Sequence, residues 1–296
     1  MNSLTYYITA SVIKLKGIKK IFSEDPINYQ KLRKDDIHEP SSKDVFGVDL
    51  NSTHVGKSKI TQLVPKEIKS EKVILYCHGG ASVYGPTAIN WNSIARIVKK
   101  ASVKAYLIDY PKAPEYQISE INYNIDEVYS YLLKKHEAKN IILLGDSWGG
   151  TLLVLLVQRL LNNKQPLPNS IMLISPVMDC SFSNPNIKEI DSKDIMLSKV
   201  GVISAKKMCS GSLDLNNKAI SPLFGSFKNF ITTYIFIGEN DIMRPDEELF
   251  VQQLLQENVK VEVYIGKEMP HIWVFLPLIY EGRVAMKKII QILSKK

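Results

Sequence analysis

Apolar residues occur along the chain in six short runs, and amphipathic stretches separate most of these runs. The runs span residues 73–77, 105–108, 141–144, 171–174, 234–237 and 259–265. Helical periodicity occurs between them, at residues 88–100, 118–135, 151–162 and 246–257. Short, almost entirely apolar strands that alternate with helices are typical of a mostly parallel sheet covered by helices on both faces. The pattern therefore predicts an α/β fold with such a sheet at its centre.

Two parts of the chain do not show this alternation of apolar strands and amphipathic helices. Residues 1–60 have a mixed pattern, in which residues 4–22 fit one amphipathic helix with Ile8, Val12 and Leu15 on one face. Residues 180–220 form a long interruption, with a helix expected near residues 198–208. A long segment between two core strands is often a lid. We expect residues 61–296 to form the α/β domain, with residues 1–60 and 180–220 contributing a helical cap.

Glycines and polar residues follow four of the predicted strands. Residues 78–80 (His-Gly-Gly) follow the first run, Ser147 the third, Asp241 the fifth and His271 the sixth. In sheets of parallel strands, ligands bind outside the carboxyl ends of the strands. We therefore expect these four positions to meet in one site.

Ser147 lies in the sequence Gly-Asp-Ser-Trp-Gly at residues 145–149, between an apolar run and a helix. A nucleophilic serine requires a tight turn of this kind, because its hydroxyl must project toward a substrate and the flanking positions leave little room for side chains. The backbone N–H of Trp148 then points to the same place and can bind an oxyanion. The pattern predicts Ser147 as a nucleophile, although a plain Gly-Ser turn also fits it.

A serine hydroxyl needs a neighbouring base to become a good nucleophile. His271 follows the last strand, where the chain order Ser, Asp, His places that base. The carboxylate that orients the histidine is expected after the preceding strand, where Asp241 is the best placed. Asp246 and Glu239, in the same loop, stay open as alternatives. The other four histidines are His38, His54, His78 and His136.

Gly79, Gly80 and Ala81 form a glycine-rich turn after the first strand. Such a turn lets backbone N–H groups approach an oxyanion, so we predict a second set of oxyanion donors here. An ordinary tight loop is the alternative.

We expect an apolar pocket near the site, lined by Tyr84, Trp273 and Phe275. The ring of Trp148 has two interpretations. Either it occupies part of the pocket and favours short acyl chains, or it turns away and packs on the following helix.

Composition excludes several classes of function. The chain has 296 residues and a formal net charge of +8, and 45% of its residues are apolar. The charge comes mostly from scattered lysines without a nucleic-acid-binding motif, so we expect no nucleic-acid partner. The three cysteines are not at metal-binding spacing, and no phosphate-binding loop occurs, so we expect neither a metal nor a cofactor.

No run of about 18 apolar residues occurs, and residues 1–17 do not resemble a signal peptide. We expect a cytoplasmic protein without stable membrane insertion, and a homodimer is an open alternative to a monomer.

In combination, the motifs resemble the hormone-sensitive-lipase-like branch of the α/β-hydrolase esterases, also called the acetyl-esterase or arylacetamide-deacetylase-like group. They lie in the family's order, between about residues 70 and 290, and read YCHGGASVYGP, LIDYPKAPEYQIS, LLGDSWGG, AISPLFGSF, GENDIMRPDE and GKEMPHIW. The resemblance implies the α/β-hydrolase fold, a catalytic triad of Ser147, Asp241 and His271, and a cap built partly from the N-terminal segment. It also implies oxyanion donors from residues 79–81 and Trp148. The family usually has a third glycine at the position of Ala81 and alanine at that of Trp148.

The expected function is that of a serine carboxylesterase that hydrolyses short to medium acyl esters of small molecules through an acyl-enzyme. Two alternatives remain at this point. One is an amide or peptide hydrolase with the same triad, and the other is a non-catalytic ligand-binding protein with the same fold.

Overall fold

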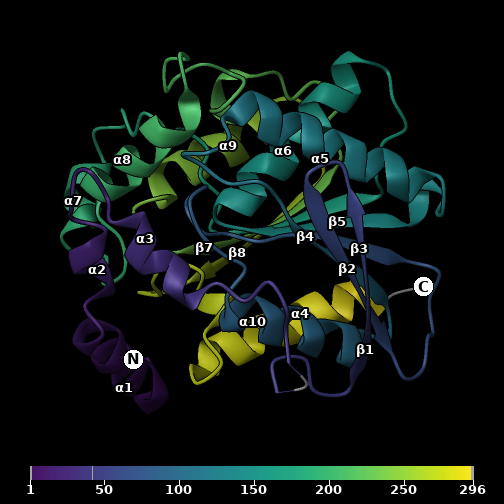
Figure 1. The fold of residues 1–296 in the computed structure, drawn as a ribbon. Coiled ribbons are helices and arrows are strands. Elements are labelled where there is room, and N and C mark those ends of the chain that lie inside the picture. The colour runs from purple at the N-terminus through teal and green to yellow at the C-terminus, as the bar shows by residue number, and fades with distance from the viewer. Residues whose placement is uncertain (1, 42, 295–296) are drawn as a thin grey trace.

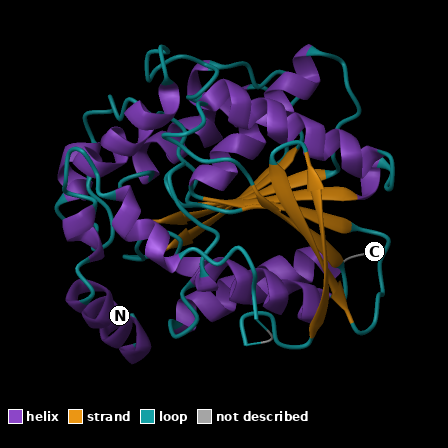
Figure 2. Ribbon diagram, in the orientation of Figure 1, coloured by secondary structure: helices purple, strands orange, loops and turns teal. Residues whose placement is uncertain are grey.

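The computed structural model describes residues 2–41 and 43–294, and its centre is one eight-stranded sheet (Figures 1 and 2). The strand order is β1-β2-β4-β3-β5-β6-β7-β8. The strands from β4 to β8 along this order pair in parallel, and β1 and β2 are antiparallel additions at one edge. Their bounds are β1 Val48–Val55, β2 Ser58–Pro65, β3 Val73–Cys77, β4 Lys104–Asp109, β5 Ile141–Asp146, β6 Ser170–Ile174, β7 Thr232–Gly238 and β8 Val261–Gly266.

The six predicted strands correspond to β3 through β8, which confirms the α/β fold class. All residues of β3, β5 and β6 are buried, because helices cover both faces of the sheet there. The sequence pattern missed β1 and β2, which mix polar and apolar residues. Most of β1 is exposed, so burial left no apolar run to find in that strand.

Helices cover the sheet on both faces (Figure 2). Helices α4 and α10 lie on one face, and α5, α6 and α9 lie on the other (Figure 1). The sequence pattern did not predict α10. The bounds of these helices are α4 Ala88–Ala101, α5 Ile118–Leu133, α6 Trp148–Asn162, α9 Arg244–Gln256 and α10 Tyr280–Ser294, and short 3-10 turns span η2 Ala138–Asn140, η3 Pro222–Phe224 and η4 Trp273–Phe275.

The expected single helix over residues 4–22 is divided into α1 (Leu4–Leu15) and α2 (Ile18–Ile21). Gly17 separates them with a φ of +65°, a left-handed conformation that glycine adopts easily. The apolar face that the pattern indicated is not the face that the structure buries. Ile8, Val12 and Leu15 are exposed, while Thr9 and Ile13 are the buried positions of α1.

The expected boundary at residue 60 falls inside the sheet, because β1 and the first residues of β2 precede it. The N-terminal segment outside the sheet therefore ends before Val48. It contains α1, α2, α3 (Tyr29–Leu32) and the 3-10 turn η1 (Arg33–Asp35).

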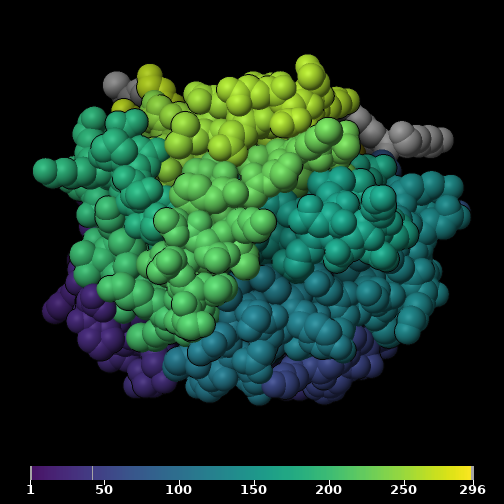
Figure 3. Space-filling view, turned by 90° about the horizontal axis from the view of Figure 1, so that it is seen from above, coloured from purple at the N-terminus to yellow at the C-terminus, as the bar shows by residue number. Residues whose placement is uncertain are grey.

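The N-terminal segment lies against the long interruption, which contains α7 (Ile187–Asp191) and α8 (Lys199–Ser210). Figures 1 and 3 show the two segments side by side. The N–H of Gly201 in α8 donates to the carbonyl of Phe22 over 2.8 Å. A Cβ atom at Gly201 would lie only 2.3 Å from that carbonyl oxygen, so this contact requires glycine.

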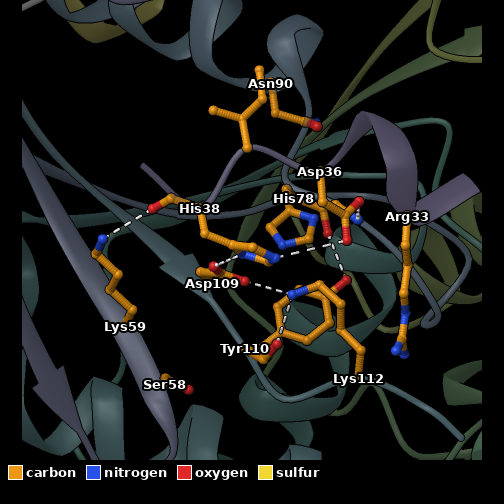
Figure 4. Close-up of polar contacts among 12 residues, drawn as sticks. Arg33, Asp36, His38, Ser58, Lys59, His78, Asn90, Asp109, Tyr110 and Lys112 are labelled. Atoms are coloured by element: carbon orange, nitrogen blue, oxygen red, sulfur yellow. Dashed lines mark hydrogen bonds and ion pairs between the residues drawn. The ribbon is translucent and has the colours of Figure 1, made fainter. Parts of the chain in front are cut away.

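A polar cluster attaches the N-terminal segment to the end of β4 (Figure 4). The Nδ1 atom of His38 lies 2.6 Å from one carboxylate oxygen of Asp109. Lys112 Nζ lies 2.5 Å from the other oxygen. The carboxylate of Asp36 accepts a hydrogen bond of 2.6 Å from the N–H of Gly85. Residues 36–38 are thereby fixed next to the loop that follows β3.

No helix within the described residues 2–41 and 43–294 combines the length and the apolar character that a membrane span requires.

Candidate active site

Ser147 lies at the sharp turn between β5 and α6. Its backbone has a φ of +49° and a ψ of −125°, which is a strained conformation for a residue with a side chain. The flanking positions are occupied by glycine because a side chain at either one would collide with neighbouring backbone. A Cβ atom at Gly149 would lie 2.0 Å from the carbonyl oxygen of Cys77, and one at Gly145 would lie 2.6 Å from the backbone nitrogen of Gly150. The turn therefore requires glycine at both positions that flank the Asp-Ser-Trp segment.

Three of the predicted residues meet at the carboxyl ends of the parallel strands. The Nε2 atom of His271 lies 2.9 Å from Ser147 Oγ. The Nδ1 atom of the same ring lies 2.8 Å from a carboxylate oxygen of Asp241. The three side chains are buried, with Asp241 wholly inaccessible. The second oxygen of Asp241 accepts a hydrogen bond of 3.0 Å from the N–H of Met243, which fixes the carboxylate.

The environment of His271 raises its pKa above the ordinary value of 6.5. Burial acts to lower the pKa, but the charge of Asp241 and its hydrogen bond outweigh this effect, and Asp194 and Asp146 add to it. The ring is therefore suited to accept a proton from the serine hydroxyl and to hold it as an imidazolium.

Asp194 is a residue that the sequence did not single out. It lies in the long interruption, and its carboxylate accepts hydrogen bonds from the N–H groups of Met196, Leu197 and Ile242. Burial, followed by the charge of Asp241, raises its pKa to about 7. It thus connects the loop that carries Asp241 to the interruption. No local motif distinguishes it, because its partners lie in two different segments.

Gly79, Gly80 and Ala81 line the same cavity as Ser147. Gly80 has a φ of +123°, and a Cβ atom there would lie 2.0 Å from the carbonyl oxygen of Tyr84. A Cβ atom at Gly79 would lie 3.0 Å from the Cβ of Ser147, so the loop backbone passes close to the serine. Ala81 has a φ of +54°, so alanine occupies a left-handed position that glycine would adopt with less strain.

Asp146, which precedes the serine, supports this loop. Its carboxylate accepts a hydrogen bond of 2.6 Å from the hydroxyl of Tyr76 and one from the N–H of Gly79. Burial raises the pKa of Asp146 to about 6, although these hydrogen bonds oppose the shift. Asp146 belongs to the Gly-Asp-Ser-Trp-Gly motif, but the motif alone predicted no role for it.

The other candidates lie elsewhere. Asp246 accepts a hydrogen bond of 3.0 Å from Asn184, and Glu239 accepts one of 2.8 Å from the N–H of Glu268. His78 stacks on Tyr110, with ring centroids 4.5 Å apart (Figure 4). His38 contacts Asp109, and His136 lies 2.9 Å from the hydroxyl of Tyr106. None of these groups has a hydrogen bond to Ser147 or His271 within the described part of the chain.

A cavity of about 880 Å³ opens onto Ser147 and His271. Its walls include residues of the N-terminal segment, such as Phe22 and Ile37, and residues of α8. Within the described residues, no group of three or more histidine, cysteine or acidic side chains could hold a metal ion.

The structure places the three residues expected in the pocket differently. Tyr84 lines the cavity, but Trp273 and Phe275 do not. Phe275 is buried and contacts Tyr76 edge to face, with ring centroids 6.2 Å apart. The ring of Trp148 is also fully buried and does not line the cavity. The expectation that this ring shortens the acyl site therefore loses its structural basis, since the ring is covered by Lys206 of α8, whose Nζ atom lies 3.6 Å from the ring centroid.

Known proteins are similar to most of this chain. A family model described as alpha/beta hydrolase fold matches residues 74–275. An esterase of Acinetobacter venetianus is 27% identical over 209 residues, which are 68% of this chain and 69% of that protein. The chain spans 50–60% of the length of further curated relatives that it matches.

Solved structures are similar over nearly the whole chain. A candidate esterase from Staphylococcus aureus has a TM-score of 0.86 at 29% identity, covering 94% of this chain and 96% of that one. An esterase from the bacterial hormone-sensitive lipase family also has a TM-score of 0.86, at 21% identity, covering 99% of this chain and 98% of that one. At the latter identity, the similarity concerns the fold.

Proposed function

The chain belongs to the alpha/beta hydrolase fold family, and from that membership we propose that it is a serine carboxylesterase that cleaves esters of small molecules through an acyl-enzyme. As a carboxylic ester hydrolase, it requires a nucleophile, a base and oxyanion donors in one cavity. The observation that carries the proposal is the buried chain of hydrogen bonds from Ser147 through His271 to Asp241, with distances of 2.9 and 2.8 Å.

In the proposed reaction, His271 takes the proton of Ser147 as the serine oxygen attacks the ester carbonyl. The protonated ring then gives this proton to the leaving alcohol, and an acyl-enzyme remains on Ser147. In the second half of the reaction, water attacks the acyl-enzyme. His271 first takes a proton from this water and then returns it to Ser147 as the carboxylic acid leaves. Asp241 holds the ring in the required tautomer and stabilises the imidazolium.

The proposed oxyanion donors are the backbone N–H groups of residues 79–81 and Trp148. Trp148 begins α6, so its N–H also lies at the positive end of the helix dipole. The loss of one such donor typically reduces the rate by about 10²–10³-fold. These N–H groups belong to the backbone, so the replacement of Ala81 by glycine would change their freedom without removing a donor.

We propose that the N-terminal segment and the long interruption form the cap of the cavity. Support comes from the cavity walls, which include Phe22 from the first segment and Val202 from the second. The contact between Gly201 and Phe22 joins the two parts. A cavity of about 880 Å³ is large enough for esters of short to medium acyl length.

A fluorophosphonate probe tests this function. The probe reacts with activated serines, so we expect an adduct on Ser147 and hydrolysis of a chromogenic butyryl ester by the unmodified protein. The Ser147→Ala variant should lose both the adduct and nearly all hydrolysis. Equal hydrolysis by both proteins would refute the proposed nucleophile, and the absence of any adduct or turnover would favour a ligand-binding protein. Cleavage of a matched anilide at a rate comparable to the ester would favour the amide-hydrolase alternative.

A further inference from the structure

Lys206 is a lysine of α8 whose side chain is fully buried in the wall of the cavity that contains Ser147 and His271. Its Nζ atom lies 3.6 Å from the centroid of the Trp148 ring. Within the described residues, Nζ has no hydrogen-bond acceptor. A buried ammonium group without an anionic or hydrogen-bonding partner is strongly unfavourable for folding. Its presence therefore calls for an anionic or hydrogen-bonding partner that the described residues do not provide.

The neighbouring groups do not supply a counter-charge. Cys180 and Cys209 interact electrostatically with Lys206, but burial raises the pKa of their thiols to about 12 and about 11, so both are neutral at pH 7. The carboxylate of Asp179, next to Cys180, accepts its hydrogen bonds from serines of the following turn. The carboxylate of Asp146 is occupied by Tyr76 and the glycine loop.

Burial lowers the pKa of Lys206 from its ordinary value to about 8, which is still above neutral pH, so the ammonium form is available to a ligand at pH 7. The face of the Trp148 ring stabilises a cation at this distance and holds it in one place. A ring cannot accept the three N–H hydrogen bonds that the ammonium group can donate, so these donors have no acceptor within the described residues.

The outer wall of the cavity also carries positive charge. Lys16, Lys31 and Lys34 line it and are exposed, and the carboxylates of Asp35 and Asp36 lie among them, so that the lysines outnumber the acids there. Exposed lysines at a cavity mouth attract anions from solution, while a buried lysine can fix the orientation of an anion that has entered.

We infer that Lys206 binds a carboxylate carried by the substrate, which makes the substrate class esters that bear a second, ionised carboxyl group. This inference rests on the proposed function, because it assigns the substrate of the same cavity. Such a carboxylate would accept the unused hydrogen bonds of Lys206 and neutralise its buried charge. It would lie on the α8 side of the cavity while the ester bond reaches Ser147.

The test compares two pairs of esters of matched shape by calorimetric binding to the Ser147→Ala variant, which cannot turn them over. One pair is monomethyl glutarate and methyl 5-methylhexanoate, where an isopropyl group replaces the carboxylate on the acyl side. The other is 4-acetoxybutyrate and 4-methylpentyl acetate, with the same replacement on the alcohol side. We expect the charged member of at least one pair to bind about tenfold tighter or more. Equal or weaker binding of the charged member in both pairs would overturn the inference.

Two substitutions locate the effect. Adding Lys206→Met should remove the preference for the charged ester, and the variant should be at least as stable as its parent, because an unpaired buried charge is replaced by an apolar side chain. Lys207→Met, at the exposed neighbouring position of α8, should retain the preference. A preference that survives Lys206→Met would also overturn the inference. Turnover by the protein with Ser147 intact is measured separately, so a failure of the proposed esterase function is distinguishable from a failure of the carboxylate site.

Discussion

The Nδ1 atom of His271 lies 2.8 Å from a carboxylate oxygen of Asp241, and both side chains are buried. The two residues are 30 positions apart in the chain and come from the loops that follow β8 and β7, two neighbouring parallel strands. Parallel pairing brings these loops to the same edge of the sheet, and the buried carboxylate then determines which nitrogen of the ring carries the proton.

The first prediction concerns this pair. Asp241→Asn should reduce kcat by about 10³–10⁴-fold, because the amide can no longer hold the ring in the tautomer that accepts the serine proton. Ester hydrolysis under saturating substrate measures this loss. Asp246→Asn is the matched control, since Asp246 contacts Asn184 rather than His271. An equal loss in the control variant would contradict the assignment of the acid.

The second prediction concerns pH. His271 must be neutral to act as the base, and its pKa lies above 6.5 because the charge of Asp241 outweighs the effect of burial. The acid limb of kcat/KM should therefore have a midpoint above about 6.5, the ordinary value for histidine. In Asp241→Asn, the residual activity should have a midpoint at lower pH, since the carboxylate no longer stabilises the imidazolium. A pH profile of both proteins measures the shift, and an unchanged midpoint would speak against the coupling.

The third prediction concerns the junction of the two cap segments. Gly201→Ala should destabilise the protein by about 1–3 kcal/mol, because the added Cβ would meet the carbonyl of Phe22 and force the segments apart. It should also raise KM, since both segments contribute to the cavity wall. Urea denaturation and steady-state kinetics measure the two effects. Val200→Ala, at an exposed position of the same helix, should change stability by less than about 0.5 kcal/mol.

The fourth prediction concerns the attachment of the N-terminal segment. Burial acts to raise the pKa of Asp109, but the hydrogen bond from His38 and the charge of Lys112 prevail and lower it to about 2. A depressed folded-state pKa stabilises the fold above the unfolded value of about 4, and this contribution disappears as the pH falls from about 4 to about 2.

Asp109→Asn should therefore lower the free energy of unfolding by about 2 kcal/mol at pH 7. Denaturation curves at a series of pH values test this expectation. The difference between the variant and the unmodified protein should shrink as the pH approaches 2. A difference that is constant across this range would mean that the carboxylate charge is not the source of the stability.

Most of the core could be predicted from the sequence because a strand buried on both faces consists almost entirely of apolar residues. Strands β3, β5 and β6 are buried throughout, so each appears as an apolar run of the right length. Strand β1 is mostly exposed and has no apolar run, so the pattern did not predict it. Helix α1 shows the opposite error, because its most apolar face is exposed and its contacts could not be inferred from periodicity.

The sequence by itself determined the six core strands from β3 to β8 along the chain, the residues that follow them, and the choice of Ser147, Asp241 and His271 as residues that would meet. These follow from short-range patterns combined with the general rule that parallel strands bring their carboxyl ends to one edge. Only the tertiary structure decided the burial of the Trp148 ring, the position of Asp194 beside the acid loop, and the burial of Lys206 without a hydrogen-bond acceptor among the described residues. Each of these depends on contacts between segments far apart in the chain, and burial and charge at such contacts arise from packing in three dimensions.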